Sequence, residues 1–425
     1  MFESLLEIDP TADQATMLER IEELETLKAA AAAGQARWTA AFAASRRAQE
    51  AAAGMPAAKR GRGVAGEIAL ARRESPNRGG RYLGFAQALV YEMPHSLAAL
   101  ENGVLSEWRA TLLVRESACL DVEDRRTLDA EMCADPTRLI GCGDARIAAD
   151  AKAIAYRLDP HAIVDRARKA ESERCVTIRP APDTMSWVSA LLPVAQGVSV
   201  YAALKRAADT TFDDRSRGQV MADTLVERVT GRSAAAAVPV AVNMTISDET
   251  LFGGNRPAII DGYGPIPAGI ARDLVKASVD DDRSRATLRK LYASPDTGTL
   301  VAMESKSRIF PKGLARFIGI RDQRCRTPYC DAPIRHTDHA TPHVSGGRTS
   351  ALNGDGLCEA CNYAKQAVGW HVETGTDPTG AHTAEVTTPT GAHYQSTAPP
   401  QPRPAHLDIS EVETRIAISI ARHAA

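Results

Sequence analysis

The chain has 425 residues, of which 44% are hydrophobic and 24% are charged, a balance typical of a soluble globular protein. This length corresponds to two or three domains. The 51 Lys and Arg residues nearly balance the 53 Asp and Glu residues, so a formal net charge of -2 provides no global attraction for nucleic acid or anionic lipid. The composition also excludes a disordered chain, a collagen and a disulfide scaffold.

The sequence contains no apolar run long enough for a membrane span. The longest, 234–242, has nine residues, whereas a bilayer needs roughly 20. The first residues, MFESLLEIDP, are acidic where a signal peptide has a basic start, so we expect a cytoplasmic protein with no membrane partner. In that reducing compartment the eight cysteines are expected to be thiols or metal ligands.

The N-terminal part of the chain predicts helices. Over residues 1–60, apolar residues recur at three- and four-residue spacing, which predicts one or two amphipathic helices between Thr11 and about Ala53. These residues are Ala15, Met17, Leu18, Ile21, Leu24 and Leu27. Residues 61–295 predict a mainly helical domain of unknown function with a small β element. Its helices are expected at 106–120, 144–158, 161–172, 193–209 and 217–229, and its strands at 175–178 and 238–246.

A basic stretch runs from Arg46 to Arg81. It holds nine Lys or Arg residues against three Glu residues. Such a local excess would attract a phosphate backbone. A solvated basic linker surface explains the same composition, so both interpretations stay open.

Two short motifs carry little weight. Residues 61–66, GRGVAG, match the dinucleotide pattern G-x-G-x-x-G, but no buried strand precedes them and the nearest acidic residue at the required distance is Glu92. Asp296, Glu304 and Lys306 have a spacing compatible with PD-(D/E)xK nucleases. The flanking residues fit a turn between two strands equally well, so this nuclease motif remains a weaker alternative.

Two cysteine pairs in the C-terminal part have the spacing of zinc half-sites. They are Cys325-x4-Cys330 and Cys358-x2-Cys361. Because four thiolates leave no coordination position for water, the predicted zinc site is structural and stabilises a module too small to bury much core. Arg, Pro and Gly flank the cysteines in place of an apolar periodicity, which argues against four buried thiols without metal.

Polar residues inside and beside this cysteine frame have a characteristic order: Asp338, His339, Asn353 and Asn362. The arrangement resembles the HNH endonucleases, also called ββα-metal nucleases. The resemblance covers roughly residues 308–371, including the Gly346-Gly347 turn, Leu357-Cys358 and Lys365. It implies a small zinc-stabilised ββα-metal module at 305–372. With the mainly helical N-terminal domain predicted from the apolar pattern, the expected fold class is α+β.

The resemblance also implies a function, a metal-dependent DNA endonuclease. In it His339 is the general base, Asp338 and Asn362 hold Mg or Mn, and Asn353 fixes the loop after the first strand. A histidine pKa of about 6.5 suits a base at neutral pH, and oxygen donors suit hard divalent ions. Where other members carry histidine this chain has Asn362, which favours an oxygen-preferring ion over zinc at the catalytic position.

The charge of the module agrees with DNA as the partner. Residues 301–370 hold ten basic and six acidic side chains. Arg326, Arg348 and Lys365 are the candidate phosphate contacts. Leu314, Phe317 and Ile318 predict an amphipathic helix that packs on the module. The alternative function is a non-catalytic zinc-stabilised module that binds nucleic acid.

The C-terminal end predicts two further segments. Residues 373–404 are rich in Thr, Gly and Pro and predict a hairpin followed by an extended tail. Apolar residues between Ile409 and Ile420 predict a terminal helix within 405–425. As a whole, the chain resembles bacterial repeat-family proteins that couple an uncharacterised helical domain to an HNH module. That resemblance assigns no activity to the helical domain, and the oligomeric state is left open.

Overall fold

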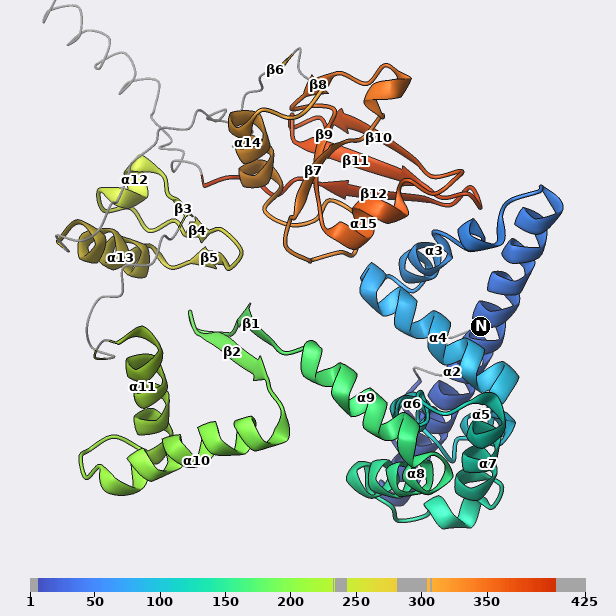
Figure 1. Cartoon of the computed structure of the whole chain (residues 1–425). Helices are drawn as coiled ribbons and strands as arrows, with labels where there is room; N and C mark the ends of the chain where they lie inside the picture. Colours follow the sequence, from blue (N-terminus) through green and yellow to red (C-terminus); the bar gives the residue numbers. More distant parts are fainter. Residues whose placement is uncertain (1–6, 232, 234–242, 281–303, 306–307, 403–425) are drawn as a thin grey trace, which may run out of the picture. The chain divides into compact units, whose positions relative to one another are not determined.

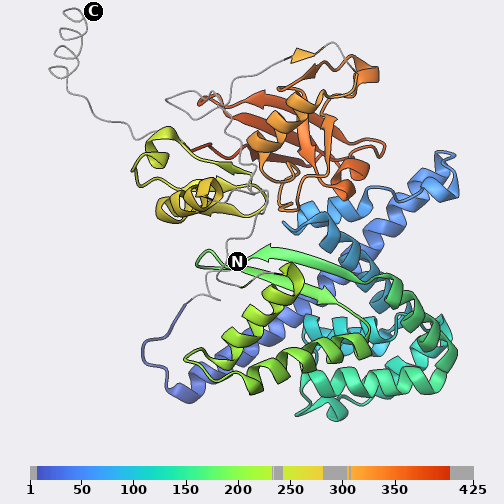
Figure 2. The ribbon, with the colours of Figure 1, turned by 60° about the vertical axis from the view of Figure 1, so that its left-hand side comes forward.

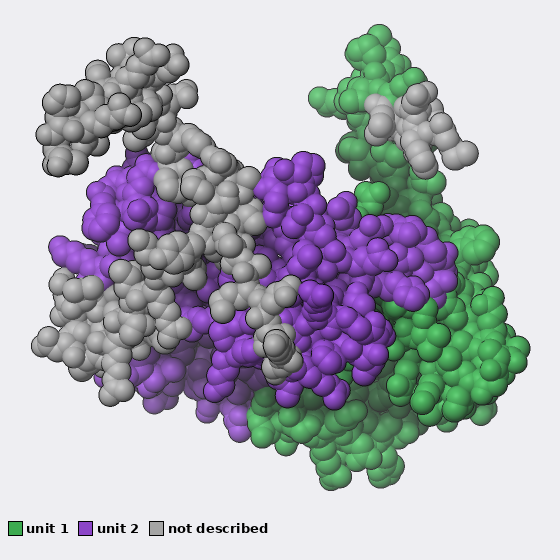
Figure 3. Space-filling view, turned by 90° about the horizontal axis from the view of Figure 1, so that it is seen from above, with its two compact units in different colours: residues 1–174, 328–330, 360–370 green, residues 175–327, 331–359, 371–425 purple. Residues whose placement is uncertain are grey.

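The computed structural model describes residues 7–231, 233, 243–280, 304–305 and 308–402. The chain divides into two compact units, shown in green and purple in Figure 3. Unit 1 comprises Met1–Arg174, Pro328–Cys330 and Ala360–Trp370, and unit 2 comprises Cys175–Thr327, Asp331–Glu359 and His371–Ala425. The predicted α+β class is confirmed, since the N-terminal region is helical and the small sheets of the described residues all lie after it.

Unit 1 is built on helices (Figure 1). They are α2 (Gln14–Ala52), α3 (Val64–Ala71), α4 (Pro76–Glu92), α5 (Pro94–Glu101), α6 (Glu107–Glu116), α7 (Val122–Cys133), α8 (Asp144–Leu158) and α9 (Pro160–Ser172). Asp13 caps the first of them by accepting a hydrogen bond from the backbone N–H of Thr16. Helices α4 and α5 pack along α2, as Figures 1 and 2 both show.

The long helix α2 packs through a face that differs from the predicted one. Met17, Leu18 and Ile21 are exposed among the described residues. The buried face comes from the alanine-rich middle of the helix, with Ala29, Ala32, Ala33, Ala36, Ala40 and Ala43. Because alanine carries a single methyl group, neighbouring helices can approach this part closely. The larger core side chains come from those helices and include Leu89, Met93, Leu100, Leu113, Leu128 and Ile147.

Helix α3 is held firmly on its neighbours α2 and α4. Val64 and Ile68 form a small core with Ala43. The buried carboxylate of Glu67 forms an ion pair with Arg46 at 2.9 Å. A Cβ atom at Gly79 would lie 2.0 Å from the carbonyl oxygen of Ala65, so glycine is needed where α3 and α4 touch.

The first part of unit 2 contains two small β elements. Strand β1 (Cys175–Pro180) pairs antiparallel with β2 (Ser186–Leu191), and α10 (Val194–Thr210) and α11 (Arg217–Thr230) follow. The sheet β3 (Met244–Thr245), β4 (Ala258–Ile260) and β5 (Gly264–Ile266) lies with α12 (Asp248–Leu251) and α13 (Ala268–Asp280). The five helices predicted in this region and before it are present as α6, α8, α9, α10 and α11. Most of the predicted strand 238–246 lies outside the described residues.

The cysteine-containing region consists of short elements. Helix α14 (Lys312–Asp322) is the predicted amphipathic helix, and Leu314 and Ile318 form a core with Phe310 and Ala351. Strand β7 (His336–His339) pairs antiparallel with β9 (Gly354–Leu357), so that His339 lies opposite Gly354. Strand β6 (Glu304–Ser305) pairs with β8 (Thr349–Ser350), and α15 (Glu359–Ala364) follows β9.

The C-terminal segment forms a three-stranded antiparallel sheet, β10 (His371–Thr376), β11 (His382–Thr387) and β12 (His393–Thr397). The predicted hairpin and tail at 373–404 therefore miss the third strand, because its short His-Tyr-Gln-Ser-Thr sequence has little apolar alternation. The predicted helix at 405–425, together with Asp296 and Lys306, lies outside the described residues. Within those residues, no helix combines the length and apolar character needed to cross a bilayer.

Candidate functional site

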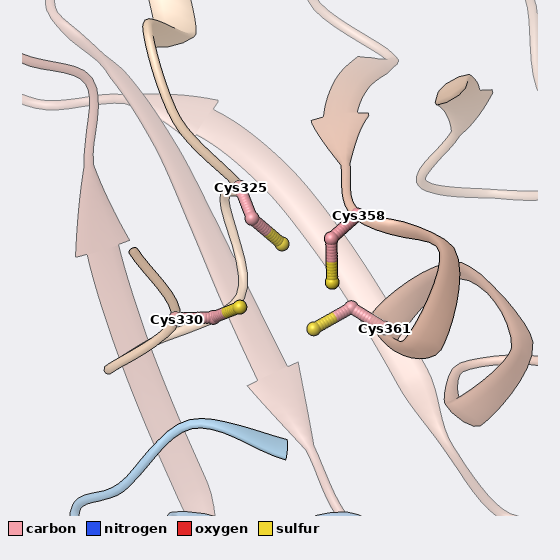
Figure 4. A group of neighbouring side chains, drawn as sticks. All are labelled: Cys325, Cys330, Cys358 and Cys361. Atoms are coloured by element: carbon pink, nitrogen blue, oxygen red, sulfur yellow. The ribbon is translucent and has the colours of Figure 1, made fainter. Parts of the chain in front are cut away.

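Four cysteine side chains gather at one point, as the sequence predicts. Cys325 and Cys330 lie in the loop after α14, Cys358 follows β9, and Cys361 lies on α15. All four are buried, and their Sγ atoms lie within 4.8 Å of one another. Figure 4 shows the four side chains pointing toward a common centre. In a tetrahedral zinc site, Zn–S bonds of about 2.3 Å place the sulfur atoms about 3.8 Å apart. The cluster can therefore hold a metal ion such as zinc with small adjustments.

The loop between the first two cysteines is shaped for this task. The backbone N–H of Cys325 donates to the carbonyl oxygen of Ala332 at 3.0 Å and closes the loop. Tyr329 has a φ of 62°, which turns the chain sharply just before Cys330. The loop thereby presents both sulfur atoms on one side, as a four-thiolate metal site requires.

His339 ends strand β7 in a confined position. Its side chain is 8% exposed, and Nε2 lies 2.8 Å from Thr349 Oγ1. The Phe310 ring lies against it with 4.5 Å between the ring centroids. Nδ1 lies 3.8 Å from Oδ1 of Asp338, whose side chain is 35% exposed. The imidazole is therefore fixed by Thr349 and Phe310 while its second nitrogen faces a partly exposed carboxylate.

Asn353 bridges the loop that joins the two strands. Its Oδ1 accepts from the backbone N–H of Thr341 at 2.9 Å. Its Nδ2 donates to the carbonyl oxygens of Thr341 and Arg348 at 3.1 and 2.9 Å. A Cβ atom at Gly347 would lie 1.9 Å from the Thr341 carbonyl oxygen, so the Gly346-Gly347 turn leaves room for this bridge. The bridge holds the backbone directly after His339.

Asn362 lies on α15, next to Cys361, and is 8% exposed. Its Oδ1 is buried and has no hydrogen-bond partner among the described residues. Leaving a buried amide oxygen unsatisfied costs free energy, so the oxygen is suited to a ligand that it can coordinate. Lys365 lies partly exposed in the turn after this helix.

Two of the three candidate phosphate contacts are at least partly exposed to solvent. Arg348 is exposed in the loop before β8, and Lys365 is half-buried. Arg326 is different, because only 4% of it is exposed. Its guanidinium donates to the carbonyl oxygens of Ser396 and His382 at 2.8 and 3.3 Å, and burial lowers its pKa. We therefore correct the prediction for Arg326, which joins the cysteine loop to the C-terminal sheet.

Arg321 and Asp322 form a buried ion pair that the local sequence does not predict. Arg321 Nε lies 2.7 Å from Asp322 Oδ1, and Asp322 accepts from the backbone N–H of Gly356 at 2.7 Å. Arg321 also donates to the carbonyl oxygens of Gly354, at 2.6 Å, and Ala351. These bonds join the end of α14 to β9. In the sequence the pair reads as surface charge, since nothing local shows that both residues are buried.

The weaker PD-(D/E)xK motif is only partly described. Glu304 begins strand β6 and pairs in register with Ser350 of β8. Asp296 and Lys306 lie outside the described residues. The described residues therefore do not test the PD-(D/E)xK alternative.

Comparison with known families identifies the larger part of the chain. A family model described as Domain of unknown function (DUF222) matches residues 20–322, from α2 to the end of α14. This domain is typical of HNH-associated proteins, and the match ends three residues before Cys325. No curated protein and no solved structure matches the chain. Because the family model covers more than half of its length, the chain belongs to the DUF222 family.

Proposed function

We propose that the protein is a metal-dependent DNA endonuclease of the HNH type, which hydrolyses phosphodiester bonds with His339 as the general base. The observation that carries this proposal is the environment of His339. The imidazole is fixed by Thr349 and lies beside Asp338 at the end of a strand pair next to a four-cysteine cluster. Zinc bound by the four thiolates would stabilise this small module. The reducing cytoplasm is the proposed compartment, because there the thiolates stay reduced.

The two nitrogens of His339 have separate tasks in this mechanism. A neutral imidazole carries one N–H donor and one acceptor nitrogen. With the proton on Nε2, the ring donates to Thr349 Oγ1, and Nδ1 is the basic nitrogen on the side of Asp338. Nδ1 accepts a proton from the attacking water, and the resulting hydroxide adds to phosphorus while the bond from phosphorus to the 3' oxygen breaks. The leaving 3' oxygen takes a proton from solvent, so the products are a 5'-phosphate and a 3'-hydroxyl end. The fixed ring orientation removes part of the entropic cost of aiming this proton transfer.

Asp338 and Asn362 are the proposed ligands of Mg or Mn. The carboxylate of Asp338 and the unpartnered buried Oδ1 of Asn362 are both hard oxygen donors, which fits such an ion. When bound, the ion would stabilise the negative charge that develops on the phosphate and the leaving oxygen. Asn353 holds the loop after His339, and Arg348 with Lys365 would contact phosphate oxygens.

The test is cleavage of supercoiled and linear DNA by the full chain and by His339→Ala. Both proteins are assayed with Mg or Mn and again with EDTA, after their zinc contents are measured. The matched control is His393→Ala, which removes an exposed histidine from β12. We expect metal-dependent cleavage by wild type and by the control, and a loss of about 100-fold to 10,000-fold in His339→Ala. A wild type that binds DNA and cuts no form of it would favour the non-catalytic zinc module.

A further inference from the structure

Two glycines of the dinucleotide-like segment 61–66 have another role in unit 1. A Cβ atom at Gly63 would lie 2.5 Å from Nε1 of Trp370, and one at Gly66 would lie 3.3 Å from Cζ2 and Cη2 of the same ring. Gly63 also has a φ of 87°, a conformation that favours glycine. Gly63 needs a residue without a side chain, because the indole of Trp370 lies against the start of α3, and a Cβ atom at Gly66 would be in tight contact with the same ring.

The contact extends from Trp370 to helix α15. A Cβ atom at Gly66 would lie 3.7 Å from Cβ of Ala364, the last residue of α15. One at Gly63 would lie 3.1 Å from Cβ of Ala367. Helix α15 therefore meets α3 through its own end as well as through the indole.

Helix α15 is joined to Trp370 by a continuous series of turns. The backbone N–H of Lys365 donates to the carbonyl oxygen of Cys361 at 3.1 Å, and that of Ala367 donates to Ala364 at 3.0 Å. The N–H of Trp370 then donates to Ala367 at 3.3 Å. With such short links, a displacement of the indole is transmitted to the helix that carries Cys361 and Asn362.

The surface under the indole is well supported. Helix α3 is fixed by the ion pair of Glu67 with Arg46, in which the side chains are only 5% and 12% exposed. The helix also packs closely on α4 at Gly79. Trp370 itself is 9% exposed, so the ring is largely withdrawn from solvent in this contact.

We propose that Trp370, docked on Gly63 and Gly66, is a positioning residue that holds α15 so that Cys361 and Asn362 keep their places. The assignment of Asn362 to the catalytic ion rests on the proposed function, whereas the docking contact does not. Helix α3 then supports α15 within unit 1, and Gly63 and Gly66 are explained without a nucleotide.

The test begins with hydrogen exchange on the full chain. Gly66→Val places a branched side chain against the indole. The matched control is Gly84→Val on α4, where a Cβ atom meets nothing within 4 Å. We expect faster amide exchange within residues 360–370 and faster release of zinc to a chelator in Gly66→Val, with no change in Gly84→Val. Equal exchange and equal zinc release in the two variants would overturn the docking contact.

The second readout concerns the position of Asn362. The Mn concentration for half-maximal DNA cleavage is expected to rise in Gly66→Val and Trp370→Ala, and kcat to fall about 100-fold, as for a displaced catalytic group. Trp370→Phe keeps an aromatic ring and should restore most of both values. Faster amide exchange in these variants with an unchanged Mn concentration for half-maximal cleavage would overturn the positioning role of Trp370. If wild type cuts no DNA, the proposed function fails, and exchange and zinc release alone decide the docking of α15.

Discussion

At the scale of single residues, the reactivity proposed for His339 depends on Thr349. The hydroxyl lies 2.8 Å from Nε2, and Thr349 is itself 2% exposed. In the proposed tautomer this buried hydroxyl accepts a hydrogen bond from Nε2–H, which leaves Nδ1 as the base. A side chain that holds a catalytic group by a hydrogen bond influences catalysis although it does not touch the substrate.

We therefore predict that Thr349→Val lowers kcat for DNA cleavage about 10-fold to 100-fold. Valine has nearly the shape of threonine but cannot accept a hydrogen bond from Nε2–H. Thr349→Ser keeps a hydroxyl and serves as the matched control, with activity near that of wild type. The measurement is kcat at saturating Mn, with zinc content and thermal unfolding as tests of folding. Full activity in Thr349→Val would show that this hydroxyl does not set the proton position on His339.

Site residues with a characteristic spacing could be predicted from the sequence. Residues whose role depends on contacts with distant elements could not. The cluster of four cysteines was predictable, because two short spacings are sufficient to indicate a shared metal. Thr349 and the pair Arg321-Asp322 carry no such signal, since their partners lie in other elements. Arg326 was misinterpreted for the same reason, because nothing near it in the sequence shows the sheet that buries it.

At the scale of elements, the sheet β10–β12 packs on the cysteine-containing region through polar groups. Arg326 donates to Ser396, and Ser396 Oγ donates back to the Arg326 carbonyl oxygen at 2.6 Å. His382 Nε2 donates to the carbonyl oxygen of Leu352 at 2.8 Å. Burial is the main cause that lowers the pKa of His382 to about 4. The sheet is therefore docked by a histidine that must stay neutral.

This docking predicts a pH-dependent stability. Above pH 6.5, His382 is mostly neutral in both folded and unfolded chains. Between pH 6.5 and 4 the unfolded chain binds a proton that the folded chain does not, so the free energy of unfolding falls as the pH falls. Between pH 7 and 5 the loss should be about 2 kcal/mol. Urea unfolding of wild type and His382→Gln measures it, since glutamine keeps a donor and does not titrate. An equal pH dependence of the two proteins would contradict the assignment.

The boundaries of a helix could be predicted from the sequence where its apolar residues recur with a clear helical period. Helix α8 spans 144–158, as predicted from its pattern. In α2 the period was correct for a helix but the wrong face was expected, because alanines give a weak signal although they pack closely. The third strand of the C-terminal sheet was missed for a similar reason, since its stability comes from pairing with β11.

At the scale of the whole molecule, the basic stretch 46–81 divides into structural and exposed cations. Arg46 pairs with Glu67, and Arg72 stacks 3.6 Å from the Tyr82 ring centroid while pairing with Glu107. Lys59 and Arg62, by contrast, are exposed in the segment before α3. The stretch is therefore partly internal to the helical domain, and Lys59 and Arg62 are the cations we propose to attract a phosphate backbone.

The last prediction separates DNA binding from a merely solvated surface. If Lys59 and Arg62 contact phosphates, Lys59→Ala/Arg62→Ala should weaken DNA binding for all sequences and reduce the slope of log K against log salt by about 2, one for each lost contact. The matched control is Arg146→Ala/Arg168→Ala, which removes two exposed cations from α8 and α9 that pair with nearby aspartates. Binding is measured by anisotropy with catalytic metal omitted. Equal slopes in both double variants would assign the stretch to the solvated surface, and a smaller slope in the first alone would place DNA on the DUF222 helices.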